Sequence, residues 1–208
     1  MRIDEIIERS NRIRERYHQL ELKHHGSKWT VGEDALAFVT DAGLVGRLTM
    51  SHQERWPKGG NEKEELSHKL GESVWWLTVL STRMRIDFTK SIGDFLEESI
   101  HDMQQLKRLS LELRESYQQA ELEFHGSEWT VEEDALAFLT DIALVVRMVM
   151  AQQKRWPLHD YEQIELEHKL GESVWWLTVL AHRMNLDIEV ALENFLAKTE
   201  KLLLKKSE

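Results

Sequence analysis

The stretch His68–Leu80, with the sequence HKLGESVWWLTVL, recurs letter for letter at His168–Leu180, one hundred residues further along a chain of 208 residues. Shorter matches at the same offset precede it, including Trp29-Thr30-Val31 and Arg55-Trp56-Pro57. A repeat of this length covers several helices, so each copy is a structural unit rather than one turn of a solenoid. Any site that one copy builds can therefore be built by the other.

The composition predicts an all-α fold. The chain has two prolines, Pro57 and Pro157, at the same place in each copy, and it is otherwise rich in Leu, Glu, Lys, Arg and Ala. We expect two tandem helical units, residues 1–100 and 101–208, that share one core as an intramolecular pseudo-dimer. This arrangement leaves room for a homodimer of pseudo-dimers.

Each unit is expected to contain four helices. Gly26 offers a left-handed cap to the first helix, Thr30 with Glu33 forms the capping-box pattern of the second, and Asp87 is placed to cap the fourth. In the first copy the helices are expected at about 2–23, 30–55, 62–86 and from 87 onward. The segment between the second and third helices differs between the copies, KGGNEK against LHDYEQ, so we expect it to be flexible.

The charge and the residue types exclude several classes of partner. The formal net charge of −10 provides no basic footprint for a nucleic-acid backbone and predicts repulsion from anionic lipid surfaces. The chain has no cysteine, which excludes disulfides and thiolate metal sites. No apolar stretch is long enough for a membrane span, and the acidic start MRIDEIIERS is not typical of a signal peptide. We expect a soluble, cytoplasmic protein that binds neither polymeric nucleic acid nor membranes, while a carboxylate-held metal would still admit a small phosphorylated ligand such as a nucleotide.

A carboxylate falls inside the apolar stripe of the second helix in both copies. Asp41 lies between Phe38 and Val45, and Asp141 occupies the same place in the second copy. Burying an unpaired carboxylate costs several kcal/mol, so each needs a cation, a set of hydrogen bonds or a raised pKa. A hydrogen bond from a neighbouring Trp, Arg or backbone amide would meet this need, and so would a metal ion.

The third helix carries charged and metal-binding residue types on one face. Spacings of three and four place Glu65, His68, Lys69 and Glu72 together, away from the apolar face. Two carboxylates and an imidazole form half of a metal site if Asp41 faces them, whereas ordinary Glu-to-Lys pairs on a solvated face give the same pattern. The candidate metal ligands are Asp41, Glu65, His68, Glu72, Asp141, Glu165, His168 and Glu172.

The tryptophans and arginines are open to a structural and a functional interpretation. Trp75 and Trp76 are adjacent, so at least one must point into the core. Trp29 and Trp56 lie at expected helix ends, where each could staple a loop or stack on a base. Either of two roles, a surface position or a phosphate clamp, fits the arginines Arg47, Arg83, Arg147 and Arg183 equally well.

Taken in order, these features resemble one family of all-α enzymes. Trp129 is followed by Glu132-Glu133, an apolar helix to Met148 and a variable loop, and KLGESVWWLTVL then leads into RMRIDFTKSIGDFL in one copy and RMNLDIEVALENFL in the other. This order is similar to that of the MazG-like nucleoside triphosphate pyrophosphohydrolases and covers nearly the whole of both copies. The resemblance implies hydrolysis of a nucleoside triphosphate to monophosphate and pyrophosphate, with magnesium held by carboxylates in E-E-x-x-E and E-x-x-D patterns.

Both copies depart from the metal motifs that this resemblance implies. In the first copy the E-E-x-x-E position reads Thr40-Asp41-Ala42-Gly43-Leu44 and keeps only the middle acid, and the E-x-x-D position reads Lys69-Leu70-Gly71-Glu72, with lysine in place of the first acid. The second copy shows the same losses. His68 could replace one missing ligand, although imidazole suits manganese or iron better than magnesium. The expected cofactor is a divalent metal, manganese or magnesium.

Three functions remain open, and the resemblance favours the first. A MazG-like hydrolase would act on a nucleotide or a related phosphorylated small molecule, with catalytic Lys69 and Lys169 neutralising phosphate charge beside the metal. A family member without catalysis would bind a ligand or a partner, which the loss of the same ligands from both copies supports. A di-iron or di-manganese helical bundle would use the ferritin-like pattern Glu65-x-x-His68 and its counterpart Glu165-x-x-His168.

Overall fold

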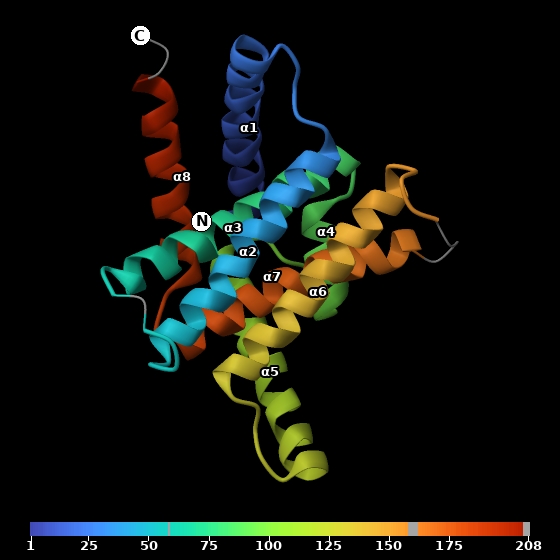
Figure 1. Cartoon of the computed structure of the whole chain (residues 1–208). Helices are drawn as coiled ribbons and strands as arrows, with labels where there is room; N and C mark the ends of the chain where they lie inside the picture. The colour runs from blue at the N-terminus through green and yellow to red at the C-terminus, as the bar shows by residue number, and fades with distance from the viewer. Residues whose placement is uncertain (58, 158–161, 206–208) are drawn as a thin grey trace.

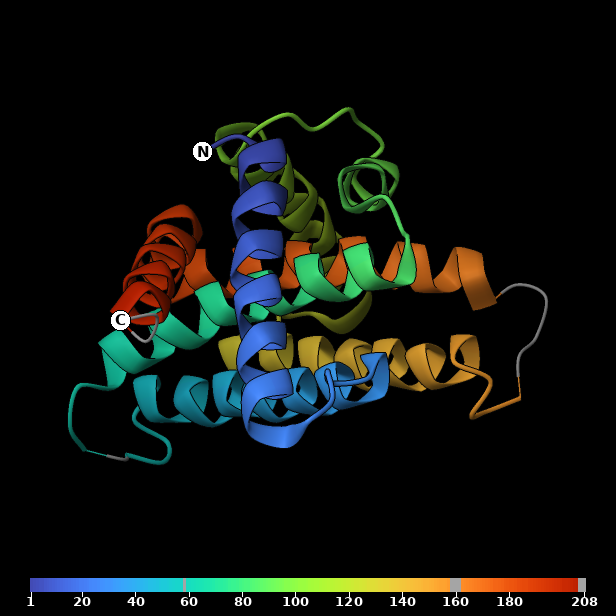
Figure 2. The ribbon, with the colours of Figure 1, turned by 90° about the horizontal axis from the view of Figure 1, so that it is seen from above.

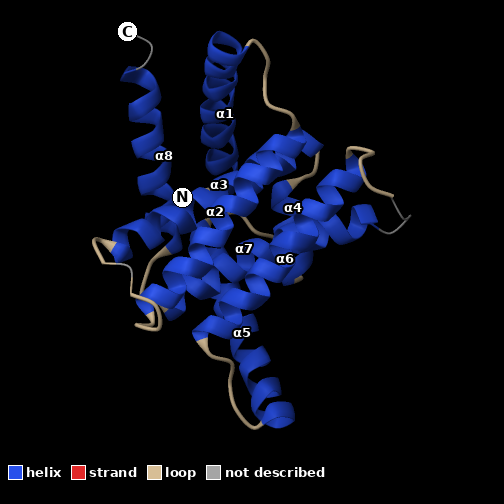
Figure 3. Cartoon of the chain, in the orientation of Figure 1, coloured by secondary structure: helices blue, strands red, loops and turns tan. Residues whose placement is uncertain are grey.

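The computed structural model describes residues 1–57, 59–157 and 162–205, and these residues form eight α-helices and no β-strand (Figures 1 and 3). The all-α prediction is confirmed. The helices are α1 (Ile3–His25), α2 (Val31–His52), α3 (Glu62–Met84), α4 (Phe88–Leu96), α5 (Met103–His125), α6 (Val131–Gln152), α7 (Glu162–Arg183) and α8 (Ile188–Lys205). Lys58 and residues 158–161, which include most of the LHDYEQ segment predicted to be flexible, lie outside the described residues. No helix among the described residues is both long and apolar enough to cross a membrane.

The predicted helix ends are confirmed where their residues impose a local geometry. Gly26 adopts a φ of 74° after α1, a left-handed conformation that costs glycine little. Thr30 accepts a hydrogen bond from the Glu33 amide, and the Glu33 side chain accepts one from the Thr30 amide, so the capping box of α2 is complete. Asp87 caps α4 by accepting a hydrogen bond from the Lys90 amide.

The four long central helices form two layers. α2 packs against α3 and α6 packs against α7, as expected for consecutive antiparallel helices. α2 also packs against α6, and α3 against α7. Figure 2 shows α2 and α6 in one row and α3 and α7 in a second row above it. The apolar residues between these rows belong to one core that draws on both copies of the repeat.

The fourth helix of each copy packs on the third helix of the other copy. α4 lies against α7 and α8 lies against α3, whereas α4 and α8 make few contacts with the third helix of their own copy. Gly71 lets α8 approach so closely that an added Cβ would overlap the carbonyl oxygen of Ala191, and Gly171 does the same beneath Ser91 of α4. The two copies therefore exchange helices, which the sequence analysis did not predict.

Reciprocal contacts relate the two copies. The Ile3 amide donates to the His101 carbonyl at 3.0 Å, and the Met103 amide donates to the Met1 carbonyl at 2.9 Å. Each bond repeats the other with the copies interchanged, as a two-fold relation requires. The pseudo-dimer interpretation stays a prediction, and these are the contacts that it demands. In Figure 1, α1 and α5 extend from the central layers in opposite directions.

Candidate functional site

Asp41, Lys69 and Glu72 meet at the α2–α3 interface in a charged network. Lys69 Nζ lies 2.7 Å from Asp41 Oδ1 and 2.6 Å from Glu72 Oε2, and Trp76 Nε1 donates to Asp41 Oδ2 at 2.9 Å. In the second copy Lys169 contacts Asp141 at 2.8 Å and also pairs with Glu172. The tryptophan partner that the sequence analysis offered for the buried carboxylate is therefore present, together with a lysine ammonium.

Partial burial makes this network electrostatically significant. The side chains of Asp41, Lys69 and Glu72 are 19 %, 21 % and 17 % exposed. Burial lowers the pKa of Lys69, but its hydrogen bonds to Asp41 and Glu72 outweigh burial and raise the pKa overall. Burial raises the pKa of Glu72, and its bond to Lys69 opposes that shift. The ammonium thus stays charged and supplies the positive charge that the two carboxylates require.

The remaining predicted ligands of the first copy face a neighbouring cavity. Glu65, His68 and Lys69 line a space of about 520 Å³ together with Lys198, while Glu72 lines a different pocket. His68 Nε2 is 3.9 Å from Glu72 Oε2, and its ring packs on Phe195 with centroids 5.3 Å apart. Burial, with Lys198 and Lys69 nearby, lowers the pKa of His68. The single charged face expected on α3 is therefore divided between two cavities.

Among the described residues, no group of three or more histidine, aspartate or glutamate side chains is arranged to hold a metal ion. Asp41 and Glu72 do converge, but the Lys69 ammonium lies between their oxygens, where a cation bridging them would sit. The donor set that remains does not fit a divalent metal, because a fixed positive charge occupies its place. The metal ligands named from the sequence stay a prediction.

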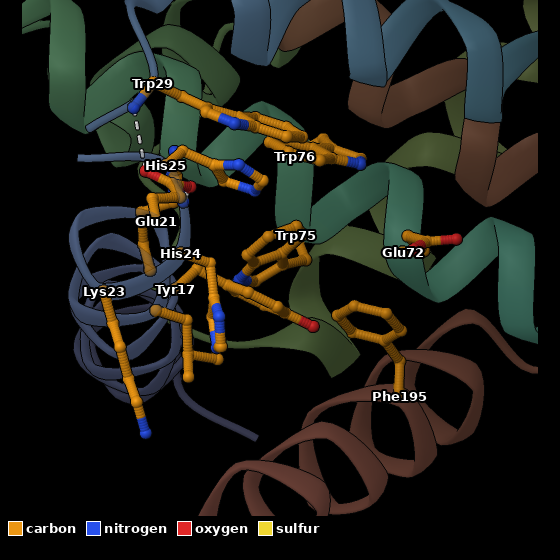
Figure 4. A pocket seen from close by; sticks show the side chains of 12 residues that line it. Tyr17, Glu21, Lys23, His24, His25, Trp29, Glu72, Trp75, Trp76 and Phe195 are labelled. Atoms are coloured by element: carbon orange, nitrogen blue, oxygen red, sulfur yellow. Dashed lines mark hydrogen bonds and ion pairs between the residues drawn. The ribbon is translucent and has the colours of Figure 1, made fainter. Parts of the chain in front are cut away.

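An aromatic pocket of about 670 Å³ opens beside Glu72. Figure 4 shows Trp29 and Trp76 next to each other along one side, with Trp75 and Tyr17 on another. Trp75 packs on Trp76 with centroids 4.4 Å apart and on Phe195 of the exchanged helix α8 at 5.5 Å. Trp75 and Trp76 are both buried, so the tryptophan pair belongs to the core and to the pocket wall at once.

The second copy forms an equivalent pocket of about 710 Å³. Trp129 and Trp176 line it with nearly parallel rings, 3° apart in orientation and 6.4 Å between centroids. Residues shared with the first pocket by the repeat are Tyr117, His125, Trp129, Glu172 and Trp176, which correspond to Tyr17, His25, Trp29, Glu72 and Trp76. The duplication therefore produces two pockets that share these five positions, although the second is also lined by Asp141 and not by Trp175 or Phe95.

A second buried network holds the Trp29 edge of the pocket. Asp34 is fully buried between Arg14, which contacts it at 2.7 Å, and Arg83. Arg14 also pairs with Glu21, and Glu21 accepts a hydrogen bond from the Trp29 amide at 2.8 Å. The second copy repeats the network with Arg114, Glu121, Asp134, Arg183 and Trp129.

The role of this network was not predicted from the sequence. Arg83, for which a surface position and a phosphate clamp were both open, donates to the Trp29 carbonyl at 2.9 Å and pairs with Asp34. Arg47 donates to the Trp56 carbonyl and lies over the Trp56 ring at 3.9 Å. A signal existed, since Arg14, Glu21, Asp34 and Arg83 all recur at the hundred-residue offset.

Comparisons with known proteins add no relative: no protein-family model, no curated protein and no solved structure matches this chain.

Proposed function

We propose that the chain is a small-molecule binding protein that holds a ligand with a flat heteroaromatic ring, such as a nucleobase, in each of its two aromatic pockets and does so without a metal ion. The observation that carries this proposal is the lysine ammonium between two carboxylates, present in both copies. It provides internally the charge that a divalent cation would provide. This proposal corresponds to the second function left open by the sequence, a MazG-like protein that binds a ligand without catalysis.

The pocket walls support the choice of ligand. Trp29 is 37 % exposed, although tryptophan gains from burying its large apolar surface. Its backbone is held by Glu21 and Arg83, so the residue is positioned at the pocket edge before any ligand arrives. Stacking of a base on an aromatic side chain contributes about 1–3 kcal/mol and tolerates any base, because every base has a π-face.

A metal-dependent hydrolase is the competing proposal, and it requires a rearrangement. Metal binding at Asp41 and Glu72 would have to displace the Lys69 ammonium from two hydrogen bonds of 2.7 and 2.6 Å. The displaced ammonium would then need another anion, and a substrate phosphate could provide it. Activity would therefore depend on metal and substrate entering together.

Isothermal titration with a panel of nucleosides and their triphosphates separates the two proposals. We expect saturable binding in the presence of EDTA, and no pyrophosphate release when magnesium or manganese replaces the EDTA. Trp29→Ala with Trp129→Ala should abolish binding, because each change removes a pocket wall and leaves the capping box intact. Trp56→Ala with Trp156→Ala is the matched control, since those tryptophans are 59 % and 45 % exposed and line neither pocket.

Two results would overturn the proposal. One is the absence of binding by every probe in EDTA. The other is metal-dependent pyrophosphate release that Lys69→Met with Lys169→Met increases, because that would show a cation site blocked by lysine in the native chain.

A further inference from the structure

The two aromatic pockets differ in the charge of the residues that line them. Lys23, His24 and His25 line the mouth of the first pocket at the end of α1. The second copy has Glu123 and Phe124 at the positions of Lys23 and His24. In the same loop, Lys28 of the first copy corresponds to Glu128 of the second. Glu123 and Phe124 do not line the second pocket, whose charged lining residues include Glu133, Asp141 and Glu172. The basic pair that lines the first pocket is therefore not repeated, and the charged residues that line the second pocket are acids.

The basic side chains at the first mouth are not used by the fold. Lys23, His24 and His25 are exposed, and none forms an ion pair or a side-chain hydrogen bond with another described residue. In Figure 4 the His24 ring lies beside Tyr17 and the His25 ring lies next to Trp76, while the Lys23 side chain extends away from the tryptophans. Their donors are available to a bound molecule, because a lysine ammonium has three donors and no acceptor.

Helix stability does not explain this charge. Basic residues in the last turn of a helix interact favourably with its dipole, so Lys23 and His24 could have stabilised α1 alone. However, α5 ends at the same glycine cap with Glu123 and Phe124 in the equivalent places. The helix end therefore forms without the basic pair, and in α5 it tolerates an acid that the dipole disfavours.

We infer that the first pocket is specific for a ring that carries a phosphate, and that the second pocket rejects the phosphate and takes the uncharged form. This inference rests on the proposed function and assigns a different ligand class to each copy. Two identical subunits cannot diverge in this way, because one sequence builds both sites. A tandem copy removes that restriction, and the letter-for-letter retention of His68–Leu80 keeps Glu72 and Trp76 and their counterparts in the walls of both pockets.

Each pocket can be tested alone in the full chain. Trp129→Ala leaves the first pocket, and Trp29→Ala leaves the second. Calorimetric titration of five common nucleosides and their 5′-monophosphates into each variant, in EDTA and at low salt, measures the preference for phosphate. We expect the first pocket to bind the monophosphate at least about tenfold more tightly than its nucleoside, with the preference falling as salt rises. The second pocket should prefer the nucleoside.

Replacing Lys23 and His24 by their counterparts from the second copy provides the decisive comparison. Lys23→Glu with His24→Phe, made in the Trp129→Ala chain, should reduce the phosphate preference to about one or below. Lys201→Glu makes the same charge change on α8, outside the pocket, and should leave the preference intact. Equal preferences in the two pockets, or a preference that survives the exchange, would refute the inference while leaving the proposed function standing. Failure of every probe in both variants would refute the proposed function and the inference together.

Discussion

Replacing Lys69 with methionine tests the charged network directly. The substitution keeps an unbranched side chain of about the length of the lysine stem and removes the ammonium, so Asp41 and Glu72 lose the cation between them. Breaking a buried ion pair costs about 3–5 kcal/mol, and breaking an exposed pair costs at most about 1 kcal/mol. Because the three side chains are roughly one-fifth exposed, we expect a loss of about 2–3 kcal/mol in the free energy of unfolding.

Thermal and chemical unfolding would measure this loss. For a chain of this size, about 2–3 kcal/mol corresponds to a fall of roughly 5–10 °C in Tm. Lys90→Met is the matched control, because Lys90 pairs with Asp94 on the surface, where the two side chains are 61 % and 55 % exposed. The control should lose less than about 0.5 kcal/mol.

The pH dependence of the stability loss provides a second, independent test of this prediction. Without Lys69, the folded-state pKa of the Glu72 carboxyl rises further above its unfolded value, since burial already raises it and the opposing bond is lost. A raised carboxyl pKa costs stability above that pKa and costs nothing once the group is protonated in both states. The difference between Lys69→Met and the native chain should therefore shrink as the pH falls from 7 towards about 4.

Divalent metal adds a further arm to this experiment. Manganese should raise the Tm of the Lys69→Met variant, in which the carboxylates are free, more than that of the native chain. The sequence-based metal hypothesis expects the opposite pattern: stabilisation of the native chain that is lost when His68 and His168 become alanine. A Lys69→Met loss no larger than that of Lys90→Met, or one that grows at low pH, would refute the reasoning about the network.

Three other perturbations have definite expected outcomes. Gly71→Ala should cost at least about 2 kcal/mol in urea unfolding, because the added Cβ overlaps the Ala191 carbonyl, whereas Gly43→Ala, in open space on α2 where the other copy already has Ala143, should gain up to about 1 kcal/mol; equal effects would contradict the exchanged packing. Thr30→Ala should lower the free energy of unfolding by about 1 kcal/mol through loss of the capping box, and a neutral result would show that the cap adds nothing. Burial lowers the folded-state pKa of His68, so stability measured by urea titration should fall as the pH drops below about 6.5, and the fall should be shallower in His68→Gln; an unchanged slope would exclude His68 as a contributor.

The sequence predicted those features that depend on local residue types. The capping box at Thr30, the glycine cap at Gly26 and the Asp87 cap all involve bonds between residues within a few positions of each other, so their geometry follows from short spacings. The partial burial of Asp41 followed from helical periodicity. These features needed no knowledge of how the helices meet.

The exchange of fourth helices could not be predicted in the same way. The repeat shows that α4 and α8 are equivalent, but it does not show which third helix each one packs on. The two candidates, α3 and α7, have the same sequence over His68–Leu80 and His168–Leu180. For the same reason Phe195 was not recognised as a wall of the pocket that contains Trp75.

The role of Lys69 illustrates how a family pattern can mislead about charge. Measured against an E-x-x-D motif, lysine at this position is a lost ligand beside a metal. Measured against its own surroundings, it is a cation with two carboxylate partners, and Trp76 binds the remaining oxygen of Asp41. If the site works without a metal, as proposed above, the lysine meets the need of the two neighbouring carboxylates for a positive charge. The same network occurs in both copies, so we expect it to stabilise each half alike, whereas Lys23 and His24, which form no ion pair or side-chain hydrogen bond with another described residue, are not repeated.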